Sequence, residues 1–199
     1  MLNIIDYGVG NLGSLINIHK SININASVAS QPDDILNASH LILPGVGSFD
    51  NGMKKLNDSG LRDALEYAVI TKKIPILGIC LGMQLMTRKS EEGDLEGLGW
   101  IDAETVQFDL SEEYKIPHIG WNNVSEENPN NLLNSSKIQR FYFVHSYHVR
   151  CPEIYTICKT DYGIRFTSAF KNENIYGVQF HPEKSHNFGK KLLKNFSLL

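Results

Sequence analysis

The sequence predicts an α/β protein with a mixed, largely parallel central β-sheet. Short β-branched or apolar runs alternate with segments of helical period in the first half of the chain, a pattern typical of parallel strands joined by helices. The second half is richer in strand-like runs, so the sheet is expected to become mixed there. With 199 residues, 42% hydrophobic and 21% charged, the chain has the size of one globular unit, and we expect a single domain over residues 1–199.

Strands and helices are expected to alternate over the first eighty residues. The first helix is expected at 12–20, and strands are expected at 2–6, 26–30, 40–43 and 74–79. A second helix is predicted over 61–71, because its apolar residues recur with the spacing of a helix face that packs on a sheet. These residues are Leu61, Ala64, Leu65, Ala68 and Val69.

The second half is expected to contain mainly strands and to end in a helix. The strands are expected at 103–108, 141–145, 155–159, 165–170 and 175–180. Residues 125–136 are rich in Asn, Glu, Pro and Ser and are expected to form a surface loop. The final helix is expected over 186–199, with a core-facing stripe of Phe188, Leu192, Leu193 and Phe196.

The charge and the hydropathy pattern exclude several classes of partner. The formal net charge is −3 and the pI is near 6.2, without the basic stripe that binding to nucleic acid or an anionic membrane needs. No apolar run approaches the roughly 20 residues that cross a bilayer, and the first residues lack the basic region of a signal peptide. We therefore expect a cytoplasmic protein whose partners are small molecules or another protein.

The cysteine count favours free thiols rather than disulfides. The chain has an odd number of cysteines, namely Cys80, Cys151 and Cys158, and it is long enough to fold without cross-links. His145 and His148 lie near the last two and imitate a metal site, but an odd offset along one strand would point the two rings to opposite faces. Because no C-x-x-C pair is present either, we expect no metal.

Residues 78–82 read GICLG, the spacing of a nucleophile elbow with cysteine as the nucleophile. A buried strand leads into this motif and a helix-forming run, residues 81–88, follows it. Glycines two residues either side of Cys80 fit a turn with no room for side chains, and a helix N-terminus would favour the thiolate. The alternative is an ordinary buried cysteine.

A second motif, GVQFHPEKS at residues 177–185, supplies the groups that a thiol nucleophile needs. His181 titrates in the range of a general base, and Glu183 could accept from its ring and fix the tautomer. Pro182 would keep the chain extended and so point both side chains to one side. A lone histidine is more often structural, but the two motifs together predict a Cys80, His181 and Glu183 triad.

Attack of a thiolate on an amide creates an oxyanion that preplaced N–H donors must stabilise. One donor in an elbow is the backbone N–H after the nucleophile, here that of Leu81. The second is expected from Val46 in the loop LPGVGSF at residues 43–49, where two glycines permit close approach. A Pro-Gly turn without a catalytic role would carry the same signal.

With these segments, the chain resembles the class I glutamine amidotransferases, and within them the glutaminase subunits of imidazole glycerol phosphate synthases. The resemblance runs nearly end to end and includes YGVGNL at 7–12, PHIGWN at 117–122 and FYFVHSY at 141–147. It implies a three-layer fold with a mixed, largely parallel sheet and a nucleophile elbow. It also implies contact with glutamine by Gly47, Gln84, Ser146 and Tyr147.

The same resemblance implies a division of labour between two subunits. Glutamine would form a thioester on Cys80, and the released ammonia would pass through a channel to a cyclase (synthase) partner of barrel fold in a heterodimer. The partner would make imidazole glycerol phosphate for histidine biosynthesis, and the glutaminase would need no cofactor. Asn11, Trp121 and Lys184 would lie toward the partner.

Three other interpretations remain open from the sequence. The segment LGWIDAE at 98–104 is closer to a divergent branch that feeds ammonia to surface-sugar biosynthesis. GVGNLG at 8–13 matches the dinucleotide-binding pattern of a nicotinamide-dependent oxidoreductase, although no acid closes the second strand. A non-enzymatic regulatory protein could also use this scaffold.

Overall fold

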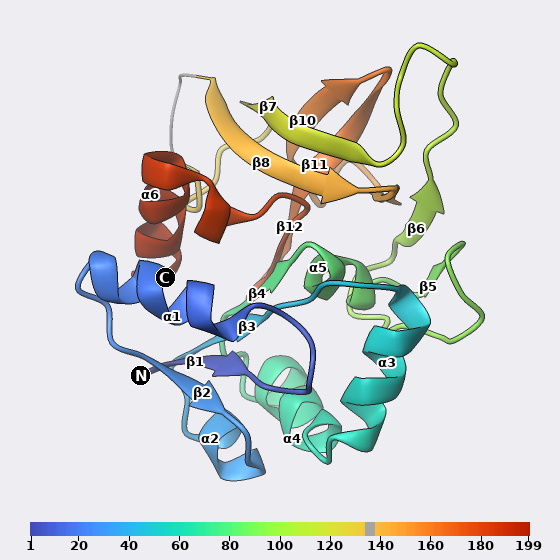
Figure 1. Cartoon of the computed structure of the whole chain (residues 1–199). Coiled ribbons are helices and arrows are strands. Elements are labelled where there is room, and N and C mark those ends of the chain that lie inside the picture. The colour runs from blue at the N-terminus through green and yellow to red at the C-terminus, as the bar shows by residue number, and fades with distance from the viewer. Residues whose placement is uncertain (134–137) are drawn as a thin grey trace.

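The computed structural model describes residues 1–133 and 138–199, and its strands form one mixed sheet (Figure 1). In one half of the sheet, neighbouring strands run parallel in the order β2-β1-β3-β4-β12. These strands are β1 (Leu2–Ile5), β2 (Ala26–Ala29), β3 (His40–Leu43), β4 (Ile76–Ile79) and β12 (Ile175–Val178). Their shared direction brings the ends of β3, β4 and β12 to the same edge, where the candidate nucleophile follows β4.

The other half of the sheet is antiparallel and continues from β12 in the order β11-β10-β7-β8. These strands are β7 (His118–Glu126), β8 (Gln139–His145), β10 (Thr156–Tyr162) and β11 (Ile164–Asn172). A side branch leaves β11 through β9 (Tyr147–Arg150), β6 (Glu104–Gln107) and β5 (Lys89–Ser90). The sheet is therefore mixed, as the sequence predicts, and its parallel half is the one that carries the candidate nucleophile.

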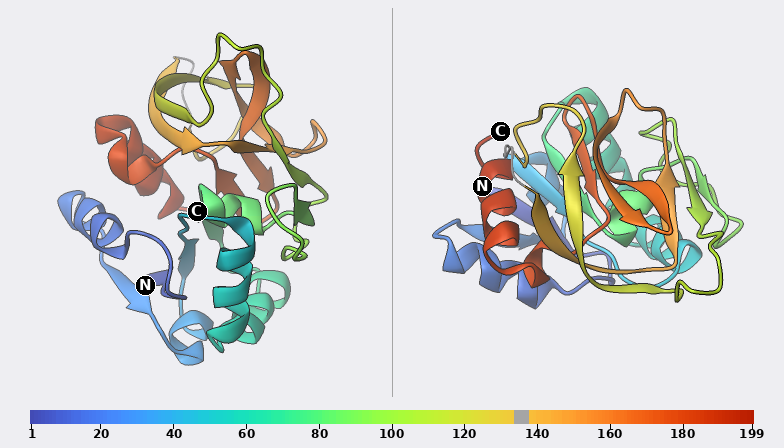
Figure 2. Two further views of the ribbon diagram at one scale, coloured as in Figure 1. Left: turned by 45° about the vertical axis from the view of Figure 1, so that its right-hand side comes forward. Right: turned by 90° about the horizontal axis from the view of Figure 1, so that it is seen from above.

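Helices cover both faces of the parallel half, which makes three layers (Figure 2). Ile4 packs in one core with α1 (Leu12–Ser21) and α6 (His186–Phe196). Its neighbour Ile5 packs in the other core, because successive strand residues point to opposite faces. The helices on that second face are α2 (Pro32–Leu36), α3 (Phe49–Asp58), α4 (Arg62–Glu66) with the π-helical turn η1 (Tyr67–Thr71), and α5 (Leu81–Leu85).

Two expectations about burial are wrong. Phe188 is 38% exposed, and the buried residues of α6 are Gly189, Leu192, Leu193 and Phe196. The expected loop 125–136 begins inside β7, and its Leu132 and Leu133 are buried because the side chain of Asn130 accepts from their N–H groups and turns the chain inward. Residues 134–136 of that loop lie outside the described residues.

Several elements differ from the sequence prediction in extent. The helix expected over 61–71 divides into α4 and η1, and the helix after Cys80 ends at Leu85 rather than Arg88. Helix α3 was not predicted, although its buried Phe49, Met53 and Leu56 have helical spacing. Strand β7 was also not predicted, because its polar residues obscure the alternation of buried and exposed positions.

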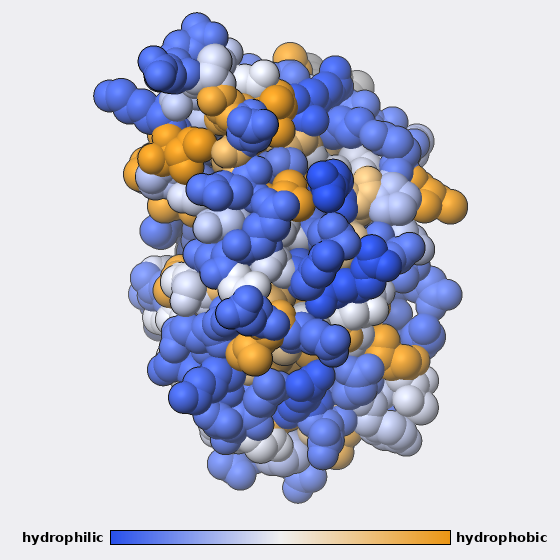
Figure 3. All heavy atoms as spheres, turned by 90° about the vertical axis from the view of Figure 1, so that its right-hand side faces the viewer, coloured by the Kyte–Doolittle hydropathy of each residue, from blue (hydrophilic) through white to orange (hydrophobic). Residues whose placement is uncertain are grey.

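The surface seen in Figure 3 is mostly polar, with apolar residues in small separate patches. None of the helices in the described residues has the length and apolar character that crossing a bilayer requires.

Candidate active site

A cavity of about 310 Å³ opens where the ends of the parallel strands meet the antiparallel half of the sheet. It brings together segments that lie far apart in the sequence, namely the loop after β3, the start of α5, the turn between β8 and β9, and the turn after β12. Nine of the lining residues are ones for which the sequence predicts a role: Val46, Gly47, Cys80, Leu81, Gln84, Ser146, Tyr147, His181 and Lys184. Glu92, Pro117, Val144 and His145 also line the cavity and were not predicted.

The GICLG motif forms a sharp turn between β4 and α5. Cys80 adopts a φ of 53°, a conformation that non-glycine residues rarely take. The flanking glycines are needed for space, since a Cβ at Gly82 would lie 1.9 Å from the Leu43 carbonyl oxygen and one at Gly78 would lie 2.7 Å from the Gly82 oxygen. Helix α5 has only five residues, so its contribution to the sulfur is limited to the N–H groups of its first turn.

His181 and Glu183 form a buried pair beside Cys80. His181 Nδ1 lies 2.8 Å from Glu183 Oε1, and both side chains are at most 5% exposed. The expectation of an extended chain is wrong here, because Pro182–Lys184 forms the 3-10 turn η2, which brings the carboxylate to the ring. Burial lowers the pKa of His181, but hydrogen bonds to Cys80 and Glu183 and the charges of both groups outweigh it and raise the pKa to about 10.

The sulfur of Cys80 has two further polar neighbours. The Val144 carbonyl oxygen lies 3.8 Å from Sγ and can accept the thiol proton. The side-chain amide of Gln179 donates to Sγ over 3.7 Å. Cys80 is 7% exposed, so the cavity reaches the sulfur while the surrounding protein excludes most water.

The loop at residues 43–49 packs directly against the elbow. A Cβ at Gly45 would lie 2.8 Å from both the Gly82 nitrogen and the Leu81 Cβ, so only glycine allows this approach. Tyr7 supports the loop from behind by donating its hydroxyl to the Pro44 carbonyl over 2.6 Å. Burial and the nearby charge of Cys80 raise the pKa of Tyr7 well above its ordinary value, which keeps this donor protonated. The loop thus brings Val46 and Leu81 to one cavity.

The expected substrate residues lie on two walls of the cavity. Gln84 is 5% exposed and its Nε2 donates to the Tyr147 carbonyl over 3.2 Å and to Gln179 Oε1 over 3.1 Å. Both bonds use Nε2, so Oε1 is the atom of Gln84 that can meet a ligand. Gly47 has a φ of +100° and no atom lies within 4 Å of the place where its Cβ would be, while Ser146 and Tyr147 form the other wall.

Glu92 is the acidic side chain among the lining residues. Its Oε2 accepts from the N–H of Phe49 over 2.8 Å, which fixes the carboxylate at the cavity. Burial raises the pKa of Glu92, that hydrogen bond opposes the rise, and the charge of Asp50 adds to it. In the sequence Glu92 lies in the acidic run SEEGD, which resembles a solvated loop and gave no functional signal.

His145 continues from the cavity wall into a chain of buried histidines. Its Nδ1 lies 2.7 Å from the Tyr147 carbonyl oxygen, which can only accept, so Nδ1 carries the proton. Its Nε2 then accepts from His118 Nδ1 over 3.0 Å, and His118 Nε2 accepts from Asn122. Burial lowers the pKa of His145 to about 3 and that of His118 to about 4, so both rings are neutral at pH 7.

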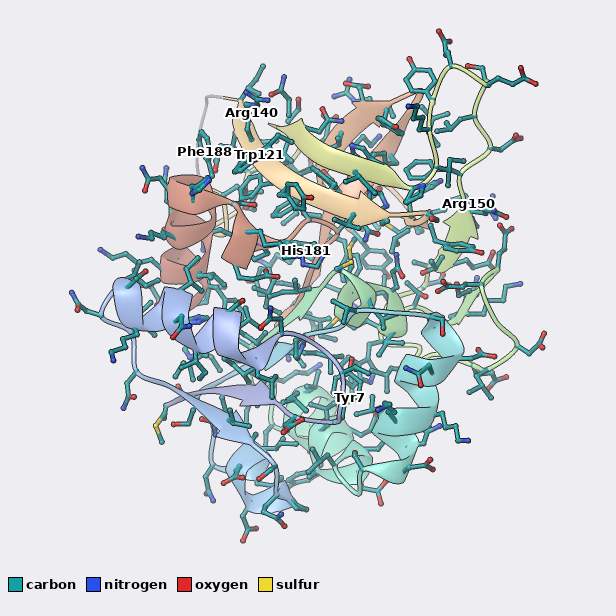
Figure 4. All side chains as sticks on the ribbon, viewed as in Figure 1. Tyr7, Trp121, Arg140, Arg150, His181 and Phe188 are labelled. Atoms are coloured by element: carbon teal, nitrogen blue, oxygen red, sulfur yellow. The ribbon has the colours of Figure 1, made fainter. Side chains whose placement is uncertain are left out.

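Of the three residues expected to face a partner, Lys184 lines the cavity, and Trp121 and Asn11 do not. Lys184 lines the cavity and a second groove that it shares with Ser14 of α1 and with His186. Trp121 is 39% exposed and stacks on the ring of His186, with the centroids 5.3 Å apart. Asn11 is exposed and caps α1 by accepting from the Ser14 N–H. In Figure 4, Trp121 lies toward the upper left edge and His181 near the middle.

Two other sequence patterns have structural explanations. Gly10, within GVGNLG, has a φ of +103°, and a Cβ there would lie 2.9 Å from Pro44, so this glycine allows the loop after β1 to reach the loop after β3. His145 and His148 belong to different strands and both pack on Phe108, so their assignment to one strand is wrong. Among the described residues, no group of three or more His, Cys, Asp and Glu side chains could hold a metal ion.

The segment 98–104 contributes to the core rather than to the cavity. Trp100 and Ile101 are buried, and Trp100 donates to Glu66 over 2.7 Å. None of its residues lines the cavity. This segment therefore supports the packing of the core and does not contact the cavity directly.

Sequence comparison connects this geometry to known proteins. A family model described as "Glutamine amidotransferase class-I" matches residues 3–198. A protein of Methanococcus maripaludis named "Imidazole glycerol phosphate synthase subunit HisH 2" is 54% identical over 198 residues, 98% of each chain. A protein of Leptospira interrogans named "Imidazole glycerol phosphate synthase subunit HisH" is 46% identical over the whole of both chains.

Solved structures share the fold at low sequence identity. One described as "Crystal structure of glutamine amidotransferase" superposes with a TM-score of 0.77 at 16% identity, and covers 98% of this chain and 96% of the other. A glutamine amidotransferase of Thermotoga maritima gives a TM-score of 0.67 at 19% identity, over 98% of this chain and 81% of the other. These similarities concern the three-layer arrangement.

Proposed function

The chain belongs to the class I glutamine amidotransferase family, and on that premise we propose that it hydrolyses glutamine to glutamate and ammonia with Cys80 as the nucleophile. The observation that carries the proposal is that His181, which is paired with the buried Glu183, lines the same cavity as Cys80. The raised pKa of His181 favours an imidazolium beside a thiolate, which is the form of a cysteine nucleophile that attacks an amide.

The proposed reaction assigns one role to each group. The Cys80 sulfur attacks the carboxamide carbon of glutamine, and the oxyanion that forms is stabilised by N–H groups of Leu81 and Val46. His181 gives its proton to the leaving nitrogen, so that ammonia departs and a thioester remains. Water, deprotonated by His181, then attacks the thioester carbon, which releases glutamate and returns the proton to the enzyme. Glu183 holds the ring and stabilises its positive charge.

The cavity fits an amino acid that carries a terminal amide. Gln84, Gly47, Ser146 and Tyr147 would contact the substrate, and the Glu92 carboxylate is suited to pair with an α-ammonium group. The cavity volume of about 310 Å³ is at the lower end of small-molecule sites, as expected for a ligand of this size.

We infer that the ammonia serves a cyclase partner that makes imidazole glycerol phosphate in histidine biosynthesis, because the relatives that match over the full chain are named as subunits of that synthase. Lys184, Trp121 and Asn11 would form the partner-facing surface, since Lys184 and the neighbouring His186 connect the cavity mouth to α1 and to Trp121. A cytoplasmic location follows from this role. A partner in surface-sugar biosynthesis would use the same glutaminase chemistry.

The test measures glutamate formation from glutamine by the purified chain, first alone and then with a cyclase partner and the ligand of that cyclase. We expect low turnover alone and a marked rise with the partner. Cys80→Ala should lower turnover by about 10⁴-fold or more. Cys158→Ala is the matched control, because Cys158 is also a buried free thiol but does not line the cavity.

Two results would contradict the proposal. Turnover that survives in Cys80→Ala would show that another group is the nucleophile. A chain with full affinity for the cyclase partner but no glutaminase activity, even with the ligand bound, would favour a regulatory role on this scaffold. If only an enzyme of surface-sugar biosynthesis activates the chain, the proposed glutaminase chemistry stands, but the enzyme that receives the ammonia is a different one.

A further inference from the structure

A buried glutamine outside the predicted triad contacts the nucleophile. Gln179 follows β12, two residues before His181, and is 0% exposed. Its side-chain amide lies between two polar groups, with Nε2 3.7 Å from Cys80 Sγ and Oε1 3.1 Å from Gln84 Nε2. The sequence position of Gln179 indicates this placement, because side chains two residues apart on an extended segment, here Gln179 and His181, point to the same side.

The orientation of the Gln179 amide is fixed by a backbone carbonyl that is two hydrogen bonds away. The Tyr147 oxygen can only accept, so the atom of Gln84 that faces it must be the nitrogen. The same nitrogen reaches Gln179, so the Gln179 atom that faces Gln84 must be the oxygen. The remaining end of the Gln179 amide is its NH₂ group, and that end faces the sulfur. His145 donates to the same Tyr147 oxygen and holds it in place.

We propose that Gln179 is a dedicated donor to the Cys80 sulfur, whose amide stabilises the thiolate and whose orientation is set by the chain Tyr147 oxygen, Gln84, Gln179. An NH₂ group cannot accept a thiol proton, so it interacts more favourably with the charged sulfur than with the neutral thiol. The sulfur is nearly buried, so water can replace little of this interaction.

The other groups around the sulfur do not supply the same effect. The Val144 oxygen is an acceptor and favours the thiol. His181 also stabilises a thiolate, but the ring must move its proton during the reaction, whereas the amide keeps its protons throughout. Tyr7 interacts with the charge of Cys80, but its hydroxyl donates its hydrogen bond to the Pro44 carbonyl oxygen. Glu183 acts on the sulfur through His181.

The inference rests on the proposed role of Cys80, and its test does not require glutamine. The rate at which iodoacetamide alkylates Cys80 in the full-length protein is measured from about pH 5 to about pH 10, with the modified peptide identified by mass spectrometry. Cys151 and Cys158 interfere little, because burial raises the pKa of both thiols. The thiolate reacts and the thiol does not, so the profile reports the thiolate fraction.

Two variants separate the donor from the shape of the side chain. Gln179→Met removes the donor at similar volume. Gln179→Glu keeps an oxygen for Gln84 and turns a second oxygen toward the sulfur. We expect the midpoint of the alkylation profile to rise by about one pH unit in the Met variant, with a roughly tenfold slower reaction near pH 7, and to rise further in the Glu variant.

Gln139 offers a matched control. It is a buried glutamine, 5% exposed, whose Nε2 donates to the Leu133 carbonyl over 3.2 Å, and it does not line the cavity. Gln139→Met should lower the unfolding temperature by an amount similar to Gln179→Met and leave the alkylation profile unchanged. The kcat for glutamate formation, measured in parallel, should fall about tenfold in Gln179→Met and stay unchanged in Gln139→Met.

Unchanged alkylation profiles in both Gln179 variants, or an equal shift in Gln139→Met, would overturn the inference. Loss of folding in both Gln179 variants would also overturn it, because the residue would then serve the core. If the unaltered protein has no glutaminase activity but its alkylation profile still shifts in the Gln179 variants, the proposed function is refuted and the donor role of Gln179 stands.

Discussion

Two walls of one cavity each present a buried histidine, and the two rings have opposite properties. His181, on the turn after β12, has a pKa raised to about 10, whereas His145, at the end of β8, has a pKa lowered to about 3. Both rings are at most 6% exposed. Burial lowers both pKa values, so the difference comes from the partners.

The partners differ in charge. His181 lies against Glu183 and Cys80, which can both be negative, while His145 lies between a backbone carbonyl and the neutral ring of His118. A protonated His145 would also repel His181. The cavity therefore holds the positive charge of the imidazolium beside Cys80 and keeps the ring of His145 neutral.

The largest test of this comparison removes the charge beside His181. Glu183→Gln keeps the size of the side chain but replaces the carboxylate, so the imidazolium loses its stabilising partner. We expect kcat for glutamate formation to fall by about 10³-fold. The pKa of His181, followed by NMR, should move down from about 10.

Glu173→Gln is the control for this change, because Glu173 also pairs with a cation but on the surface, 2.7 Å from Lys73. Its kcat should match that of the unaltered protein. A loss of kcat of less than tenfold in Glu183→Gln would mean that a neutral amide orients the His181 ring as well as the carboxylate does. The negative charge of Glu183 would then contribute little to catalysis.

A second test uses pH, because the two walls affect stability in opposite directions. His118 and His145 have lowered pKa values, so the unfolded chain takes up protons below the ordinary value of 6.5 while the folded chain does not until about pH 4 and 3. The pair should lower the free energy of unfolding by about 4 kcal/mol between pH 7 and pH 5, about 2 kcal/mol for each histidine. The raised pKa of His181 contributes stability that is complete below 6.5 and is lost as the pH rises through about 10.

Urea unfolding at a series of pH values measures both effects. In a variant with His118→Gln and His145→Gln, the loss between pH 7 and pH 5 should become smaller, while the loss toward pH 10 should remain. An acid loss of the same size in that variant would assign it to other groups.

The smallest expected effect comes from the neutral wall itself. His145→Gln replaces a neutral ring by a neutral amide that can still donate to the Tyr147 oxygen, so kcat/KM should fall by less than about tenfold. His148→Gln is the control, since His148 is also buried and packs on Phe108 without lining the cavity. A loss in His145→Gln comparable to that in Glu183→Gln would show that His145 takes part in proton transfer.

The local parts of the site could be predicted from the sequence. The elbow at Cys80 could be predicted because Gly78 and Gly82 are required by contacts within a few residues of the turn and with the adjacent strand. The pairing of His181 with Glu183 was also local, although its geometry is a 3-10 turn rather than an extended chain. The alternation of strands and helices predicted the parallel half of the sheet for the same reason, since each element carries its own periodicity.

The fold as a whole is needed to show which distant groups share the cavity and what charge each one carries. Glu92 and His145 line the cavity and Gln179 contacts the Cys80 sulfur, although the three come from separate segments. Of the three, Gln179 alone has a signal in its neighbouring residues, because it lies two residues before His181. Their protonation states and hydrogen-bond directions depend on burial and on partners that the fold brings together. Sequence periodicity reports which face a residue takes, whereas the environment that sets its chemistry is made by other parts of the chain.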